Sequence, residues 1–429
     1  MRDLLLASIL LVLIFQALRH PWIGVLGWTW ISTMNPHAMS WRMSDMPVAA
    51  AMAGATLLGV LLTKDKRSFF VTRESAVLML FMLWMCITLP FSIYLADSME
   101  LWSRVMKIDF MILVSLVVLY SRQHIMAMVW VMAGSLAFFG VKGGIFTIAT
   151  GGSYRVWGPE NTYIGGNNEV ALALVIVIPL IEFLRLQVKN IWANRALGAS
   201  MLLCAVAALG SQSRGALLAV LAMFLMLWVR GKHKVAMGVV LLLLGVAVIL
   251  FMPDSWSDRM STIKTYDQDS SALGRINAWW MAFNLAKANF FGGGFMIYTA
   301  EVFAKYAPDP TDIHAAHSIY FMVLGEQGFI GLFLFLLIWI LVWNRAGKLF
   351  REGRKLPQTQ WVSDLGGMCQ VSLLGYAVGG AFLSLSYYDL PYNILVVVVV
   401  AWRWLERKGW KEEKQQAADA VPDVPKALA

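Results

Sequence analysis

The chain has 429 residues, of which 59% are hydrophobic and only 14% charged, and its mean hydropathy is +0.65. Soluble domains carry about 25% charged residues, so this composition excludes a soluble protein and predicts a polytopic membrane protein. The net charge of +9 comes mostly from Lys and Arg in short connections between apolar stretches. This distribution follows the positive-inside rule and argues against nucleic acid as a partner.

Apolar stretches long enough to cross a bilayer follow one another along the chain, which predicts an all-α fold. The start is open, because residues 4–18 and 22–33 fit either two short spans or one span followed by an interfacial segment. Further spans are expected at residues 48–63, 76–94, 105–120, 125–148, 170–183, 196–210, 216–229, 235–252, 318–343, 366–385 and 394–405.

Basic residues predict which connections are cytoplasmic. They gather at residues 64–73, 185–195, 230–234 and 345–355 and in the tail from Arg407. With Arg2 also assigned to the cytoplasm, the number of spans is even, and about twelve are expected. Three long segments then face the periplasm, namely residues 34–46, 151–168 and 253–317.

The chain is therefore expected to have four parts. Residues 1–252 carry roughly the first nine transmembrane helices and the loop with Arg155, and residues 253–317 form a large periplasmic loop. Residues 318–410 hold the C-terminal transmembrane helices, and residues 411–429 form a disordered cytoplasmic tail. The large loop far exceeds an ordinary connection, so it is expected to be structured or functional. Within it, residues 276–289 have the helical spacing of an amphipathic helix on the membrane surface.

Four cationic residues break the orientation rule, because they lie on the predicted periplasmic side near membrane boundaries. They are Arg155, Arg214, Arg275 and His317. Arginine is the side chain best shaped for bidentate phosphate recognition. Each arginine alone is more simply explained as a side chain that extends to lipid headgroups. Three of them in separate segments, with few carboxylates nearby, favour an anion site.

His317 directly precedes a predicted span. A neutral imidazole at a water-exposed helix start can accept a proton near neutral pH, but a histidine that caps or packs at the interface fits the spacing equally well. His314 competes for the same role from the loop before it.

Other candidates carry weaker signals. Gly292-Gly293-Gly294 fits a phosphate-binding nest less well than a turn that ends the amphipathic helix. Asp389, after Tyr388, could orient a sugar hydroxyl or a catalytic histidine, or serve as an ordinary turn residue. The spacing of possible ligands predicts no metal site, and Asp267 and Asp269 are better explained as solvated loop residues.

Four segments form a recognisable series. They are Arg155–Pro159 followed by Asn167–Glu169, then Ser213–Ala216, then Gly274–Ile276 with Trp279 and Asn289–Gly294, and finally His317–Ser318 with Glu326–Gly328 and Gly331. Together they resemble the O-antigen ligase and polymerase superfamily of bacterial envelope glycosyltransferases. The Met34–His37 stretch also resembles exosortase-associated O-glycosylation ligases, a branch of that superfamily.

The resemblance implies a GT-C-like transferase of the inner membrane with its active site at the periplasmic face. Its donor would be an undecaprenyl-diphosphate-linked glycan and its acceptor lipid A–core oligosaccharide, as in lipopolysaccharide biosynthesis, without a metal or other cofactor and with inversion. Arg155, Arg214 and Arg275 would hold the diphosphate, and His317 would be the general base. Candidate substrate-binding residues are Asn168, His314, Tyr388 and Asp389.

Three rival functions remain open. A polymerase of the superfamily would use a second lipid-linked repeat unit as acceptor, and a protein O-oligosaccharyltransferase would use Ser or Thr. The short turn around Asp389 favours the ligase, because protein transferases often carry more periplasmic sequence there. A transporter or flippase would place ionisable groups at the membrane midplane and show repeated halves, whereas the candidates here gather at one face.

Overall fold

The computed structural model describes residues 2–44, 46–63, 71–230 and 270–419, together with residues 238, 239, 245, 253 and 256. Within these ranges the chain forms helices and connections, and no strand. Several expectations lie outside the described residues. They are the core of the span at 235–252, the pair Asp267 and Asp269, the basic residues 64–67, 232 and 234, and the tail beyond residue 419.

The helices match the expected spans wherever the structure describes them. The first half contains α1 (Arg2–Arg19), α2 (Pro21–Met34), α3 (Val48–Leu62), α4 (Arg73–Thr88), α5 (Leu95–Val118), α6 (Arg122–Ala149), α7 (Asn167–Gln187), α8 (Ile191–Gly210) and α9 (Arg214–Arg230). The second half contains α12 (Ser270–Ala288), α13 (Ala300–Tyr306), α14 (Ile319–Glu352), α15 (Gln360–Gly380), α16 (Asp389–Glu406) and α17 (Gly409–Asp419). Short 3-10 turns follow α4 at Leu89–Phe91 and α14 at Gly353–Lys355 and Pro357–Thr359.

Four helical segments of the described chain are long and apolar enough to cross a membrane. They are Arg73–Phe91, Arg122–Ala149, Ile191–Gly210 and Ile319–Lys355. An all-α membrane protein is therefore confirmed, while the count of about twelve spans and the GT-C-like fold stay predictions.

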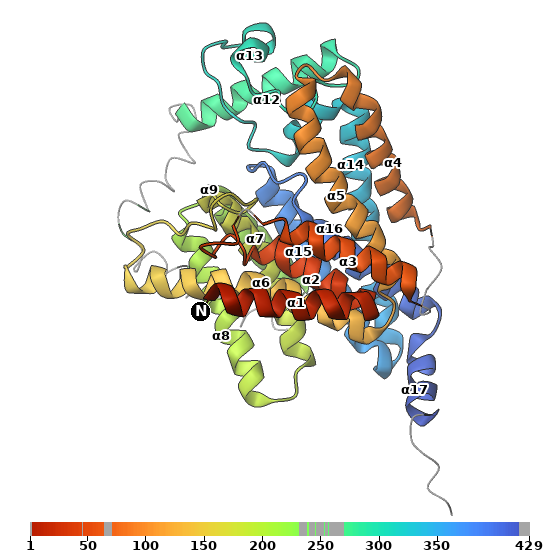
Figure 1. Ribbon diagram of the computed structural model, residues 1–429. Coiled ribbons are helices and arrows are strands. Elements are labelled where there is room, and N and C mark those ends of the chain that lie inside the picture. Colours follow the sequence, from red (N-terminus) through yellow and green to blue (C-terminus); the bar gives the residue numbers. More distant parts are fainter. Residues whose placement is uncertain are drawn as a thin grey trace, which may run out of the picture.

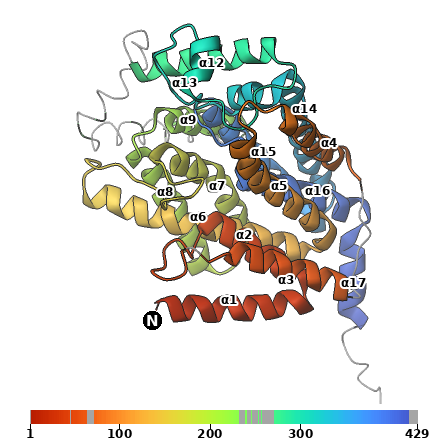
Figure 2. The ribbon, with the colours of Figure 1, turned by 45° about the horizontal axis from the view of Figure 1, so that its top comes forward.

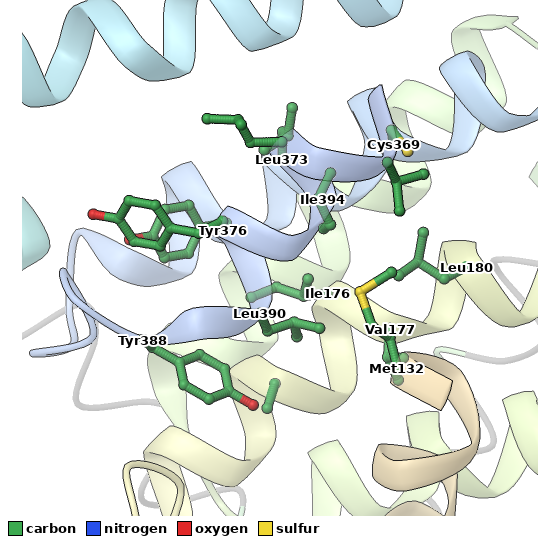
Figure 3. Packing of buried hydrophobic residues seen from close by; sticks show 14 of the residues in the cluster. Met132, Ile176, Val177, Leu180, Cys369, Leu373, Tyr376, Tyr388, Leu390 and Ile394 are labelled. Carbon is green, nitrogen blue, oxygen red and sulfur yellow. The ribbon is translucent and has the colours of Figure 1, made fainter. Parts of the chain in front are cut away.

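The core of the molecule is built around α7, which is apolar on all sides. Almost every residue from Val170 to Leu184 is buried, as expected for a helix with no polar face. Side chains of α6, α15 and α16 pack against it (Figure 3). The labelled members of this cluster are Met132, Ile176, Val177, Leu180, Cys369, Leu373, Tyr376, Tyr388, Leu390 and Ile394. This core gives the segments at its ends a rigid support.

The first three helices pack together at the N-terminus. Gly24 in α2 packs against both Ala17 in α1 and Thr56 in α3, while Ser40 Oγ, in the connection after α2, donates to Asp3 Oδ1 at 2.9 Å. Helix α2 is therefore a separate helix that returns along α1 (Figure 2). The beginning of α1 and the connection after α2 lie at the same end, so Arg2 and residues 34–46 cannot face opposite sides as the charge pattern predicts.

The C-terminal tail also differs from expectation where it is described. Residues 409–419 form helix α17, whereas the polar composition from Lys411 predicts disorder. Glu413 accepts hydrogen bonds from the Arg122 backbone amide (3.1 Å) and from Trp404 Nε1 (2.8 Å). These contacts explain why this part of the tail is helical.

Helices α12 and α13 lie together at one end of the molecule, beside the adjoining ends of α4, α5 and α14 (Figure 1). The helix expected at residues 276–289 is present as α12, while its amphipathic character and its place on the membrane surface stay predictions. Helix α14 is broken near its start, because Gly328 has φ 69° and ψ −173°. The amides of Gly293 and Gly294 donate to the carbonyls of Gly325 (2.9 Å) and Glu326 (3.0 Å), which the break leaves accessible.

Candidate functional site

The loop that carries Arg155 is bound to the short turn between α8 and α9. The Val156 amide donates to the Gly210 carbonyl at 3.2 Å, and Gln212 Nε2 donates to the Gly152 carbonyl at 3.2 Å. Arg155 Nε in turn donates to Gln212 Oε1 at 3.3 Å. Gln212 has a positive φ of 57°, and Arg214 opens α9 two residues later. The structure thus brings the segments of two predicted arginines together.

Sequence reasoning assigned no positioning role to two amide residues that build this part of the site. Gln212 is one of them, and the other is Asn167, whose Nδ2 donates to the Ser211 carbonyl at 2.9 Å. Asn168, the predicted substrate-binding residue, is the half-buried neighbour of Asn167 at the start of α7. An amide side chain in a turn before Ser-Arg-Gly is the signal that could have identified Gln212.

Helix α12 supports the loop that leads to His317. Asn277 Nδ2 donates to the carbonyls of Asp309 (2.8 Å) and Asp312 (2.9 Å), and Trp279 Nε1 donates to the Ala316 carbonyl at 2.7 Å. These bonds tie three points of the loop to one helix. The loop before His317 is therefore held in a defined conformation.

His317 lies between this loop and the start of α14. Its φ of 43° places it in the left-handed region, which is uncommon for a residue other than glycine. The ring is half-buried, and its Nδ1 is buried without a hydrogen-bond partner among the described residues. Burial, assisted by the charges of Arg275 and His314, lowers the pKa of His317 to about 4. The imidazole is therefore neutral at neutral pH.

Arg275 and His314 are neighbours of His317. Arg275 is half-buried on α12 and interacts electrostatically with both His317 and Glu169, at the start of α7. His314 packs against α12, where a side chain at Gly274 would lie 2.5 Å from its Nδ1, and that atom is 2.7 Å from Asp312 Oδ1. His314 thus has an acidic partner of its own.

The start of α7 and the turn after α15 connect the segments of Arg155 and Arg214 with the segments of Arg275 and His317. At the start of α7, Asn167 bonds to the turn before Arg214, and Glu169 interacts electrostatically with Arg275. In the turn after α15, Phe382 contacts Gly215 beside Arg214, and Ser386 Oγ donates to the Ile319 carbonyl at 3.1 Å. The segments of all four predicted residues therefore belong to one end of the helix bundle.

Tyr388 and Asp389 lie beneath this end and not on its surface. Their exposed fractions are 1% and 2%, and Tyr388 packs near Tyr163 of the Arg155 loop, with ring centroids 6.2 Å apart. The Tyr388 hydroxyl has no hydrogen-bond partner in the part of the chain that the structure describes, whereas the Asp389 carboxylate faces the Ser32 side chain of α2. A substrate could contact them only if the turn moved.

The triple glycine is a turn and not a phosphate nest. The Gly292 amide donates to the Asn289 carbonyl at 2.9 Å, and the other two amides are taken by α14. A nest needs amides that point at a ligand, so these residues cannot serve as one in this conformation. Among the described residues, no group of three or more His, Cys, Asp or Glu could hold a metal ion.

An apolar groove runs along α12 directly after Arg275. It has a volume of about 340 Å³ and is lined by Ile276, Trp279, Trp280, Phe283 and Phe321. Trp279 stacks on Phe321 with ring centroids 5.0 Å apart, and Trp280 is 52% exposed. A groove of this composition suits a hydrocarbon chain.

Comparison with known families gives this end of the molecule a context. Residues 199–336 match the family model described as O-Antigen ligase. Residues 1–189 match that of a family of unknown function, DUF5935, which names no activity. No curated protein matches the chain. The first match contains Arg214, Arg275 and His317, so the resemblance predicted from the motifs is confirmed. Residues 199–336 are therefore similar to the O-antigen ligase family, which supports the resemblance to the O-antigen ligase and polymerase superfamily over this part of the chain.

Proposed function

We propose that this protein is a membrane glycosyltransferase of the O-antigen ligase type. It transfers a glycan from undecaprenyl diphosphate to lipid A–core oligosaccharide at the periplasmic face of the inner membrane. The observation that carries the proposal is the gathering of the segments of three arginines and a neutral histidine at one end of the bundle, within a chain whose residues 199–336 are similar to the O-antigen ligase family. Arginines suit a diphosphate, and a neutral imidazole suits proton abstraction.

The arginines bind and stabilise the leaving group. The bond between the anomeric carbon and the phosphate oxygen breaks with its electron pair on the oxygen, so negative charge grows on undecaprenyl diphosphate. Arg155, Arg214 and Arg275 offset this charge electrostatically, in place of a divalent metal. The diphosphate linkage already contains the activation that the transfer needs, since the periplasm supplies no ATP.

His317 acts as the general base. It takes the proton of an acceptor hydroxyl while the hydroxyl oxygen attacks the anomeric carbon from the side opposite the diphosphate. The configuration at that carbon is therefore inverted. Binding of the diphosphate beside Arg275 offsets one of the charges that depress the pKa of His317, and thereby strengthens the base when the donor is present.

The apolar groove along α12 would receive the donor's lipid. It begins at Ile276, next to Arg275, and its exposed Trp280 offers an apolar surface. A polyprenyl chain in this groove would place its diphosphate at the start of α12, beside the proposed arginine site.

The test is a transfer assay with the purified protein, lipid-linked glycan and lipid A–core in excess chelator. We expect transfer that survives chelation and falls by at least 100-fold in His317→Ala and Arg214→Ala. Phe333→Ala is the matched control, since this residue is 62% exposed on the distant part of α14. Elongation of the lipid-linked glycan would identify a polymerase instead, and labelling of a polypeptide would identify a protein O-oligosaccharyltransferase. Movement of the lipid-linked glycan without any transfer would favour a flippase.

A further inference from the structure

A second pocket lies at the opposite end of α12 from Arg275. It has a volume of about 570 Å³, within the range of small-molecule sites. Its walls come from the connection between α4 and α5, from the turn after α12 and from α13. The lining residues include Phe91, Tyr94, Asn289, Phe290, Glu301 and Lys305. None of them is among the arginines and histidines of the site described above.

The pocket combines exposed aromatic faces with hydrogen-bonding groups. Phe91 and Phe290 are 57% and 65% exposed, and Phe91 stacks on Phe291 with ring centroids 4.1 Å apart. Sugars present apolar C–H faces and rims of hydroxyl groups, so they bind between aromatic rings and polar side chains. Glu301 and Lys305 are exposed, and Asn289 is half-buried. These residues provide an anionic acceptor, a cationic donor and an amide.

Several polar groups of the pocket are held in place by the fold. The Tyr94 hydroxyl donates to Glu301 Oε2 at 2.6 Å, and Asn289 Nδ2 donates to the Tyr306 hydroxyl at 3.3 Å. The Ile93 amide donates to the Gly293 carbonyl at 2.9 Å, which joins two walls of the pocket. The polar groups are therefore oriented before any ligand arrives, which lowers the entropic cost of binding.

We propose that this pocket is a carbohydrate subsite that binds a sugar unit remote from the reacting one. The proposal rests on the transferase function proposed above. Fourteen residues of helix and turn separate Arg275 from Asn289, which is about 20 Å at 1.5 Å per residue. A ligand that reaches both places must be an oligosaccharide. It is either the distal part of the donor glycan or part of the acceptor glycan.

The experiment compares Phe290→Ala and Glu301→Gln with the wild type in nanodiscs of phosphatidylethanolamine and phosphatidylglycerol. The matched controls are Phe333→Ala, a phenylalanine 62% exposed, and Glu100→Gln, a carboxylate 80% exposed that pairs with Arg104. Transfer kinetics are measured with a donor of one repeat unit, a donor of many units, and lipid A–core. Binding of the glycan released from its lipid is measured by calorimetry, and thermal unfolding reports on folding.

We expect both pocket variants to raise a KM by about tenfold with kcat within twofold, and the controls to change neither. A higher KM for the long donor alone identifies the donor glycan as the ligand, and a higher KM for lipid A–core identifies the acceptor. Unchanged KM values with unchanged glycan binding in folded variants would overturn the subsite and leave these residues as contacts to lipid. If the wild type transfers to no acceptor yet binds released glycan, and Phe290→Ala weakens that binding, the subsite stands while the proposed reaction fails.

Discussion

Among the arginines that connect distant segments of this protein, Arg345 and Arg155 have different kinds of partner. At the end predicted to be cytoplasmic, Arg345 of α14 donates to both carboxylate oxygens of Glu74 in α4, at 2.8 and 3.3 Å. At the opposite end, Arg155 donates to the amide oxygen of Gln212 at 3.3 Å. A carboxylate orients an arginine and neutralises it, whereas an amide orients it and leaves its charge available to an anion. The first contact therefore suits stability, and the second suits binding.

The largest expected effect comes from breaking the carboxylate pair. Glu74→Gln leaves the charge of Arg345 uncompensated in a site where the two side chains are only 2% and 14% exposed. We expect the free energy of unfolding to fall by about 3 kcal/mol, with transfer by the folded fraction unchanged. Denaturant unfolding in detergent measures this. Glu352→Gln is the control, because its pair with Lys355 is exposed and worth less than about 1 kcal/mol.

Removing the other arginine is expected to affect binding more than stability. Arg155→Gln should raise the KM for the lipid-linked donor by about tenfold to 100-fold, as for the loss of a charge-assisted contact, and lower stability by less than about 1 kcal/mol. Arg155→Lys should recover only part of the affinity, because an ammonium group lacks the bidentate geometry. A variant that unfolds as easily as Glu74→Gln would show that both arginines are structural.

Exchanging the amide for a carboxylate tests the comparison directly. Gln212→Glu should neutralise Arg155 and raise the donor KM by about tenfold, and it should lower stability by about 1 kcal/mol, because it loses the Nε2 hydrogen bond to the Gly152 carbonyl. Gln212→Ala is the companion variant, since it removes the same hydrogen bond without adding a charge. If the glutamate variant binds the donor as well as the wild type does, the charge of Arg155 does not serve the donor.

The smallest effect concerns the pH dependence. Neutral His317 is the active form of a base, and its pKa in the free protein is lowered to about 4. The plot of kcat/KM should thus stay level as the pH falls through 6.5 and decline only near 4. The decline of kcat should begin at a higher pH, because bound diphosphate offsets the charge of Arg275. His314→Ala should move the kcat/KM limb upward by a few tenths of a pH unit. If both kcat and kcat/KM declined near pH 6.5, that result would contradict the lowered pKa of His317.

The cationic side of the site could be predicted from the sequence, because a cation on the wrong side of the positive-inside pattern stands out in an apolar chain. The neutral residues that position these cations could not. Gln212 and Asn167 carry no signal in composition, and their role depends on which turn lies opposite. Burial of Tyr388 and Asp389 depends on the packing of α7, α15 and α16, which no local pattern gives.

The order of the helices was predictable, and their directions at the start were not. The sequence after His20 and Pro21 has the same apolar pattern whether this second stretch crosses the membrane or lies on its surface. The contacts of Gly24 with Ala17 and of Ser40 with Asp3 show that α2 returns beside α1. The role of the triple glycine could not be predicted either, because its amides bond to carbonyls that are accessible only through the break in α14 at Gly328.

That break divides α14 into a short and a long part. The short part, residues 319–327, is fastened by the glycine turn to the α12 side, while the long part begins after Gly328. When bilayer thickness changes, a long helix adjusts by tilting. We expect the glycine joint to absorb this tilt, so that His317 keeps its place in membranes of different thickness.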